Sequence, residues 1–385
     1  MFKGFNQVNV YVEGLGIVKK TVLVKDGKIA SIQEQKIDGL LTLPEHLIVV
    51  PGFIDKHIHG ASNEDGMYPN QKAISTIANV IASEGVSSFL VTTMTQSPKK
   101  IVEALENIKK YIESKPLSGA TAIGIHLEGP FICKKYKGAQ VEEYIVPCDV
   151  ETFKHYQEVS GNNIKQVTLA YEENGKELVR YLKKTGVVAS IGHSDASSDA
   201  TLEGIKEGIT SATHTYNAMR PIHHREIGTV GAALLSDDIY SEIIADLVHV
   251  SPNAIKLLFK CKGKDKIVAI TDGIEAKHLS DGLYHLGGQE VFVRNSEARL
   301  ADGTLAGSTL KMNVALRNLQ KVLGLSLEDT IDLATINPAI NLNINKEKGS
   351  IAVGKDADFA VIDKNFEVYY TIASGNIIYQ NDAFK

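Results

Sequence analysis

The sequence is poor in cysteine. Its 385 residues include only three, Cys133, Cys148 and Cys261, which are far apart and odd in number. They fit neither a disulfide framework nor a cysteine-rich zinc site. Because this usage is typical of proteins in a reducing compartment, we expect a cytoplasmic location.

Long apolar runs are also lacking. No stretch of about 18 apolar residues occurs, so we expect neither a membrane span nor a membrane partner. The first residues, MFKGFNQVNVYVEG, lack the continuous apolar core of a signal peptide. Positive charge is not in excess, since 41 Lys and Arg stand against 46 Asp and Glu, a formal net charge of −5. Nucleic acid is therefore not expected as a partner, and a phosphorylated ligand would need local positive charge.

Both ends of the chain consist of short apolar runs that are typical of β-strands. The N-terminal end has an Asp26-Gly27 turn signal between two of its runs, and the C-terminal end has a turn residue at Gly354. We therefore predict one small β-sandwich domain formed by both termini, residues 1–50 and 348–385. The remaining residues, 51–347, would form a second and larger domain.

The middle of the chain alternates between strand-like and helix-like patterns. Helical patterns such as QKAISTIANVIASEG and PKKIVEALENIKKYIES separate the strand-like runs. The runs lie near residues 48–56, 86–93, 121–127, 164–170, 187–192, 209–213, 242–248 and 266–271. Eight strands that alternate with helices predict an α/β fold, a TIM-like (β/α)8 barrel. An open doubly wound sheet is the alternative, but no glycine-rich dinucleotide-binding turn follows the first run.

Histidines and acids follow the ends of most of these runs. Barrel enzymes place their catalytic groups at the C-terminal ends of the strands, so these side chains should line one mouth. In chain order they are His57, His59, His126, Glu128, His193, His214, His249 and Asp272.

His57 and His59 lie two residues apart on a strand, so their side chains should leave the same face and can bind one ion. With Glu128, His193 and His214 they offer nitrogen and carboxylate ligands without a thiolate. Such a set suits Zn²⁺, Fe²⁺, Mn²⁺ or Co²⁺. The alternative is a set of buried histidines that hydrogen-bond the barrel rim.

Asp272 follows the last run in the segment ITDG. A carboxylate there can accept a proton from a metal-activated water and pass it to a leaving nitrogen. The alternative is a turn-capping aspartate before Gly273. No G-x-S-x-G motif occurs, so a serine nucleophile is not expected.

Several of these segments resemble a known family. PGFIDKHIHG resembles the P-G-x-x-D-x-H-x-H opening of the amidohydrolase superfamily. HLEGPF, IGHSDA, THTYNAM and ITDG resemble, within it, the family of N-acetylglucosamine-6-phosphate deacetylases. The resemblance covers most of the barrel, and both termini fit the small β-sandwich domain of that family. It implies hydrolysis of the acetamide of N-acetylglucosamine 6-phosphate to glucosamine 6-phosphate and acetate.

The resemblance also implies roles for the candidate ligands. Glu128, His193 and His214 would hold a principal metal, and His57 and His59 a second one, with Glu128 between the two. Two divalent metals per chain (Zn, Fe, Mn or Co) are therefore expected. Asp272 would be the catalytic acid and base.

The residues that bind the amino-sugar phosphate follow from the same resemblance. Asn217 and Ala218 lie in the loop that would cradle the sugar phosphate, and His249 would contact the substrate. Arg225 would reach the phosphate across a dimer interface, which implies a homodimer. Arginine suits this role because its planar fork binds phosphate oxygens bidentately. The loop that would close over the sugar is Leu305, Ala306 and Gly307.

Two segments depart from the family pattern. After Ala139, Gln140 stands where the family has a histidine that helps to polarise the acetyl carbonyl. Gln140 can donate a neutral N–H to the substrate but cannot become a cation. His223 and His224 precede Arg225 where small or uncharged residues are expected, and they either add phosphate contacts or are exposed loop residues.

Three other functions compete with this hypothesis. The first is deacetylation of N-acetylgalactosamine 6-phosphate, which differs at one hydroxyl group. The second is a cyclic amidase or nucleobase deaminase on the same barrel, although Arg225 and THTYNAM argue against it because a nucleobase needs no phosphate clamp. The third is a non-catalytic barrel that binds a sugar phosphate, which the complete set of metal ligands and Asp272 makes less favourable.

Overall fold

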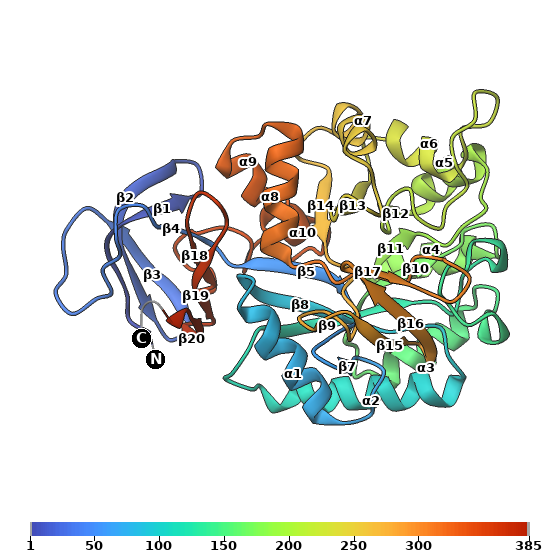
Figure 1. The fold of residues 1–385 in the computed structure, drawn as a ribbon, viewed down its shortest axis with the longest axis horizontal. Helices are drawn as coiled ribbons and strands as arrows, with labels where there is room; N and C mark the ends of the chain where they lie inside the picture. The colour runs from blue at the N-terminus through green and yellow to red at the C-terminus, as the bar shows by residue number, and fades with distance from the viewer. Residues whose placement is uncertain (1, 383–385) are drawn as a thin grey trace.

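The computed structural model describes residues 2–382 of the chain. Two sheets dominate, a small one built from both ends of the chain and a large one built from its middle (Figure 1). In residues 2–382, no helix combines the length and the apolar character needed to cross a lipid bilayer.

The large sheet is an eight-stranded parallel barrel with the strand order β14-β13-β12-β11-β10-β9-β8-β5. A bridge between Ile58 and Gly273 and a hydrogen bond from Asp272 N to His57 O (2.9 Å) join its two ends. The barrel prediction is confirmed, and the open doubly wound sheet is wrong. The strands are β5 (Phe53–Ile58), β8 (Val86–Thr92), β9 (Thr121–Glu128), β10 (Ile164–Leu169), β11 (Val188–Ile191), β12 (Ile209–Ala212), β13 (Tyr240–Ile244) and β14 (Ile267–Ile270).

Helices surround the barrel, and most of them bury an apolar face and expose a polar one, whereas α6 is almost wholly buried. Their starts carry the expected signals: Ser97 and Ser251 accept hydrogen bonds from backbone N–H groups of the first turn, and a proline follows each. The helices are α1 (Gln71–Ala82), α2 (Pro98–Ser114), α3 (Val150–Val159), α4 (Gly175–Thr185), α5 (Ser198–Glu207), α6 (Gly228–Leu235), α7 (Pro252–Lys262), α8 (Met312–Leu323), α9 (Leu327–Asp332) and α10 (Ile336–Asn341), with 3-10 turns η1 (Lys134–Tyr136) and η2 (Glu142–Tyr144).

The small sheet joins the two ends of the chain. Strand β4 pairs with β1 on one side and with β18 on the other, so the N-terminal and C-terminal segments share one sheet. Phe5 and Phe359 meet in its core with their ring centres 5.4 Å apart. The strand order is β20-β19-β18-β4-β1-β2-β3, from β1 (Gly4–Val12), β2 (Gly16–Lys25), β3 (Lys28–Gln33), β4 (Ile48–Pro51), β18 (Phe359–Ile362), β19 (Val368–Ala373) and β20 (Asn376–Gln380).

Two predicted strands have different bounds in the structure. The run 48–56 splits at Gly52, so that β4 belongs to the small sheet and β5 to the barrel. The seventh barrel strand, β13, ends at Ile244, which places His249 in the loop beyond it.

Two small sheets that the sequence analysis did not predict lie at the C-terminal mouth of the barrel. The hairpin β6 (Gly60–Ala61) and β7 (Glu64–Asp65) follows His59 directly. The three-stranded sheet β15 (Gly282–Leu286), β16 (Gln289–Arg294) and β17 (Glu297–Arg299) is inserted between β14 and α8 (Figure 1).

Candidate active site

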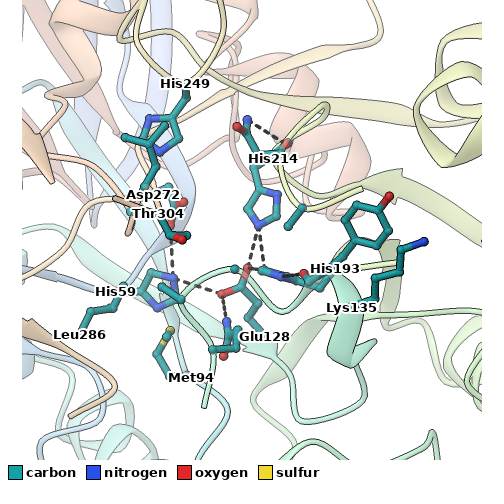
Figure 2. Close-up of a pocket in the computed structure, with 18 residues that line it drawn as sticks. His59, Met94, Glu128, Lys135, His193, His214, His249, Asp272, Leu286 and Thr304 are labelled. Carbon is teal, nitrogen blue, oxygen red and sulfur yellow. Dashed lines mark hydrogen bonds and ion pairs between the residues drawn. The ribbon is translucent and has the colours of Figure 1, made fainter. Parts of the chain in front are cut away.

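A cavity of about 290 Å³ opens at the C-terminal ends of the barrel strands. It collects most of the residues that the sequence predicts for the site, and Figure 2 shows His59, His193 and His214 pointing toward Glu128. The predicted residues that line it are His59, Glu128, Ala139, Gln140, His193, His214, Asn217, Ala218, His249, Asp272, Leu305 and Gly307.

Glu128 lies at the centre of the candidate metal ligands (Figure 2). Its Oε1 lies 3.3 Å from His193 Nε2 and 3.1 Å from His214 Nε2, while its Oε2 lies 3.2 Å from His59 Nε2. His57 Nε2 is 3.4 Å from Oε1. Two groups therefore form around one shared carboxylate: His57, His59 and Glu128, and Glu128, His193 and His214, each with ligand atoms within 4.8 Å of one another.

The backbone aims three of the site residues into the mouth. His193, His214 and Asp272 each lie two residues past the end of their strand and have φ values of 48°, 30° and 49°. Non-glycine residues in this left-handed region are uncommon and cost of order 1–3 kcal/mol each. Such conformations cluster at functional sites, where the surrounding structure holds them.

Asp272 contacts His57, which lies on β5, and His59, which follows β5 directly. Its Oδ1 lies 3.2 Å from His59 Nε2 and 3.4 Å from His57 Nε2. Burial opposes the charged form, but His57 and His59 outweigh it and hold the pKa of Asp272 below its usual value. Asp272 is therefore a carboxylate at neutral pH, facing both the cavity and the candidate ligands.

The charges of the site suit a divalent cation. Burial opposes ionisation of Glu128, but the surrounding imidazoles, His57 first, keep the pKa of Glu128 well below its usual range. Burial lowers the pKa of His59, but Asp272 and Glu128 outweigh it and raise that pKa to about 10. Glu128 raises the pKa of His214 to about 9 in the same way. Protons on imidazoles thus balance the carboxylates, and a metal ion would supply the same positive charge to the same nitrogen and oxygen atoms.

Two of the four ring nitrogens that are turned away from the centre have partners, while those of His59 and His214 have none. His193 Nδ1 lies 2.8 Å from the carbonyl oxygen of Tyr136, and His57 Nδ1 lies 3.1 Å from Glu242 Oε2. Such contacts leave the opposite ring nitrogen free to bind a metal. The sequence analysis missed Tyr136 and Glu242, although a glutamate within the apolar run of β13 is a visible signal.

Gln140 is buried beside Glu128 and held at both ends of its amide. Its Oε1 accepts a hydrogen bond from Thr95 N at 2.7 Å, which turns its Nε2 toward Glu128 Oε2 at 2.8 Å. Because an amide carries two N–H donors, one Nε2 hydrogen remains for a ligand in the cavity. Ala139, next to it, also lines the cavity.

The remaining substrate-binding candidates surround the upper part of the cavity. His249 reaches it from the loop after β13, with its Nδ1 2.6 Å from Asp246 Oδ2. Asn217 and Ala218 line it from the turn after His214. Leu305 and Gly307 line another side, whereas Ala306 is fully buried in the apolar cluster beneath the three-stranded sheet.

Arg225 is exposed and does not line this cavity. Its Nη1 lies 2.7 Å from His224 Nε2, and the rings of His223 and His224 lie 4.2 Å apart. Both histidines are exposed loop residues. Among the described residues that line the cavity, Lys135 is the one lysine, and no arginine lines it. Lys135 Nζ pairs with Asp195 Oδ2 at 3.0 Å.

Comparisons with known proteins identify the family of the chain. The chain matches the amidohydrolase family over residues 48–378. It is 43% identical to an N-acetylglucosamine-6-phosphate deacetylase of Bacillus subtilis, over 92% of each chain, and 34% identical to an N-acetylgalactosamine-6-phosphate deacetylase of Escherichia coli O157:H7, over 92% of this chain and 93% of the other.

A solved structure, the N-acetylglucosamine-6-phosphate deacetylase of Thermotoga maritima, superposes with a TM-score of 0.89 at 35% identity, over 98% of this chain and 99% of the other. The similarity spans the barrel and the small sheet together. The chain belongs to the amidohydrolase family, in the group that contains the N-acetylglucosamine-6-phosphate deacetylases.

Proposed function

We propose that this chain hydrolyses the acetamide of N-acetylglucosamine 6-phosphate to glucosamine 6-phosphate and acetate. The observation that carries the proposal is the group of four imidazoles and the Asp272 carboxylate around Glu128, at the bottom of a cavity that would hold a small molecule. The relatives from Bacillus subtilis and Thermotoga maritima are named for that activity.

Two divalent metal ions (Zn, Fe, Mn or Co) would share Glu128. Its Oε1 lies near His193, His214 and His57, and its Oε2 lies near His59, so the carboxylate stands between the two groups that would hold the ions. His57 and His59 complete the second position. When bound there, such ions lower the pKa of water and polarise an amide carbonyl.

Asp272 moves the protons of the reaction. As a carboxylate it accepts a proton from the attacking water while the oxygen of that water bonds to the acetyl carbon. It then donates this proton to the sugar nitrogen, the bond between that nitrogen and the acetyl carbon breaks, and acetate leaves. Gln140 lines the same cavity beside Glu128 and would use the second hydrogen of its Nε2 to polarise the acetyl carbonyl.

The phosphate would be bound by more than one group. Asn217, Ala218 and His249 line the cavity and would hold the sugar phosphate. Because Arg225 is exposed outside the cavity of its own chain, we assign it to a homodimer in which Arg225 of the partner subunit completes the site.

A cytoplasmic location is part of the proposal. The three cysteines are free, and Cys261 is exposed. An exposed free thiol is suited to a reducing compartment, where it does not form intermolecular disulfides.

The test is the rate of acetate release from three sugars: N-acetylglucosamine 6-phosphate, its epimer N-acetylgalactosamine 6-phosphate, and N-acetylglucosamine without phosphate. We expect the highest kcat/KM for the first sugar, and a loss mainly through KM when the phosphate is absent. A higher kcat/KM for the epimer would favour the activity that the E. coli relative is named for. Turnover of cyclic amides with none of these sugars would refute the proposal.

A further inference from the structure

A buried ion pair lies behind the candidate metal ligands. Lys56 on β5 and Glu242 on β13 are both fully buried, and Lys56 Nζ lies 3.0 Å from Glu242 Oε1. Burying two charges is costly unless hydrogen bonds satisfy them. Their remaining contacts therefore indicate what the pair does.

One oxygen of Glu242 contacts both groups of metal ligands. Its Oε2 lies 3.1 Å from His57 Nδ1 and accepts a hydrogen bond from the backbone N–H of His214 at 3.2 Å. His57 belongs to one group and His214 to the other. A single carboxylate oxygen therefore contacts the side chain of His57 and the backbone of His214.

The other oxygen of Glu242 is fixed from below. Its Oε1 receives Lys56 Nζ and the Nε2 of Gln166, the latter at 2.8 Å. Lys56 is held in turn by Gln166 Oε1 at 2.9 Å, Ser211 Oγ at 3.1 Å and Asn341 Oδ1. These donors hold the Glu242 carboxylate from one side, and its Oε2 accepts the backbone N–H of His214 on the other.

An acceptor at this place determines the tautomer of His57. Because Glu242 accepts, the proton of a neutral His57 ring must be on Nδ1, and the lone pair is then on Nε2. His57 Nε2 is buried, makes no hydrogen bond, and lies 3.4 Å from both Glu128 Oε1 and Asp272 Oδ1. The ring is thus oriented to bind an ion at the centre of the site.

We propose that Glu242, held in place by Lys56, is a positioning residue that fixes the tautomer of His57 and so sets the affinity of the His57–His59 metal position. The inference rests on the proposed metal centre and adds to it a residue on β13, six strands after β5 in the chain order of the barrel. The competing explanation is that the pair only fills the barrel interior.

The variant Glu242→Gln keeps the shape and removes the charge. We expect one of the two metal ions to bind about 10- to 100-fold more weakly, measured by competition with a chelator of known affinity. The matched control is Glu84→Gln, because Glu84 is equally buried with Lys277 at 2.9 Å but contacts none of the metal ligands. Both variants should lose stability, and only Glu242→Gln should lose metal affinity.

A spectroscopic measurement on the wild-type protein needs no variant to fold. In ¹⁵N spectra of the zinc-loaded protein, His57 should carry its proton on Nδ1, and that resonance should shift in Glu242→Gln but not in Glu84→Gln. A His57 that carries its proton on Nε2, or an unchanged metal affinity in Glu242→Gln, would overturn the inference. A wild-type protein that takes up no metal would instead refute the metal centre itself, and the same spectra of the metal-free protein would then decide the role of Glu242.

Discussion

Asp272 could act as a turn cap or as a catalytic acid and base, and its contacts favour the second role. Its backbone is held on both sides, because its N–H donates to His57 O and its carbonyl oxygen accepts from Ser308 N at 2.7 Å. Its side chain, instead of capping that turn, faces His57 and His59 and lines the cavity. The backbone thus positions the carboxylate, and the carboxylate is available for chemistry.

The variant Asp272→Asn tests this role at the level of one residue. Asparagine preserves the shape but cannot accept and return a proton, so we expect kcat to fall about 10²- to 10⁴-fold. Metal content should stay unchanged, because neither group of candidate ligands includes Asp272. Metal analysis and single-turnover rates would measure both, and a kcat within a few-fold of the wild type would remove Asp272 from the mechanism.

The sequence was sufficient to find the residues that converge around Glu128, because each stands at the end of a recognisable strand. It was not sufficient to find their supports. Lys56 is visible as a charge within an apolar strand, but its pairing with Glu242 depends on which strands face each other across the barrel. Hydrogen bonds of this kind, including that of His193 with the Tyr136 backbone, follow from the closed fold and not from local sequence.

Among the elements, the strands themselves were easier to predict than the sheet to which each strand belongs. The run 48–56 carries a break signal at Pro51-Gly52, and this is where the chain leaves the small sheet for the barrel. The β15–β16 hairpin had a visible signal, since Gly287 and Gly288 adopt φ values of 58° and 84° between paired strands. Two residues with positive φ are the mark of a tight hairpin turn, and a glycine pair predicts one.

Gly52 lies where the small sheet passes into the barrel, and the close packing there can be tested. A Cβ at this position would lie 2.5 Å from Ser87 Cβ on β8. We expect Gly52→Ala to lower the free energy of unfolding by about 1–3 kcal/mol in denaturant titrations, because the neighbouring strands must move apart. The double variant Gly52→Ala/Ser87→Gly removes the clashing side chain, and it should recover part of the loss. Equal stability of Gly52→Ala and the wild type would show that the junction is loosely packed.

In the whole molecule, the proposed phosphate site needs two copies of the chain, because Arg225 of the partner subunit would complete it. A mixture of Arg225→Ala and Asp272→Asn subunits distinguishes an arginine that acts across an interface from one that acts within its own chain. Each variant alone should be impaired, the first mainly through a raised KM for the phosphorylated sugar. In a mixed dimer, the subunit with intact Asp272 would receive Arg225 of the partner subunit, so one normal site should reappear.

The control for this experiment is Arg225→Lys, which keeps the charge but loses the bidentate fork and should raise KM less than Arg225→Ala. Subunits are exchanged before the assay, and the fraction of mixed dimers is measured by mass spectrometry. If KM in the mixture equals that of Arg225→Ala alone, Arg225 does not complete a neighbouring site.

The most direct test of the central claim is acetate release from N-acetylglucosamine 6-phosphate before and after chelation, with bound metal counted in the same samples. We expect activity to disappear with the metal and to return when about two ions per chain are restored, in proportion to the occupancy of the positions around Glu128. A fully metal-loaded protein that releases no acetate would contradict the assigned reaction, and a metal-free protein with undiminished turnover would contradict the assigned chemistry.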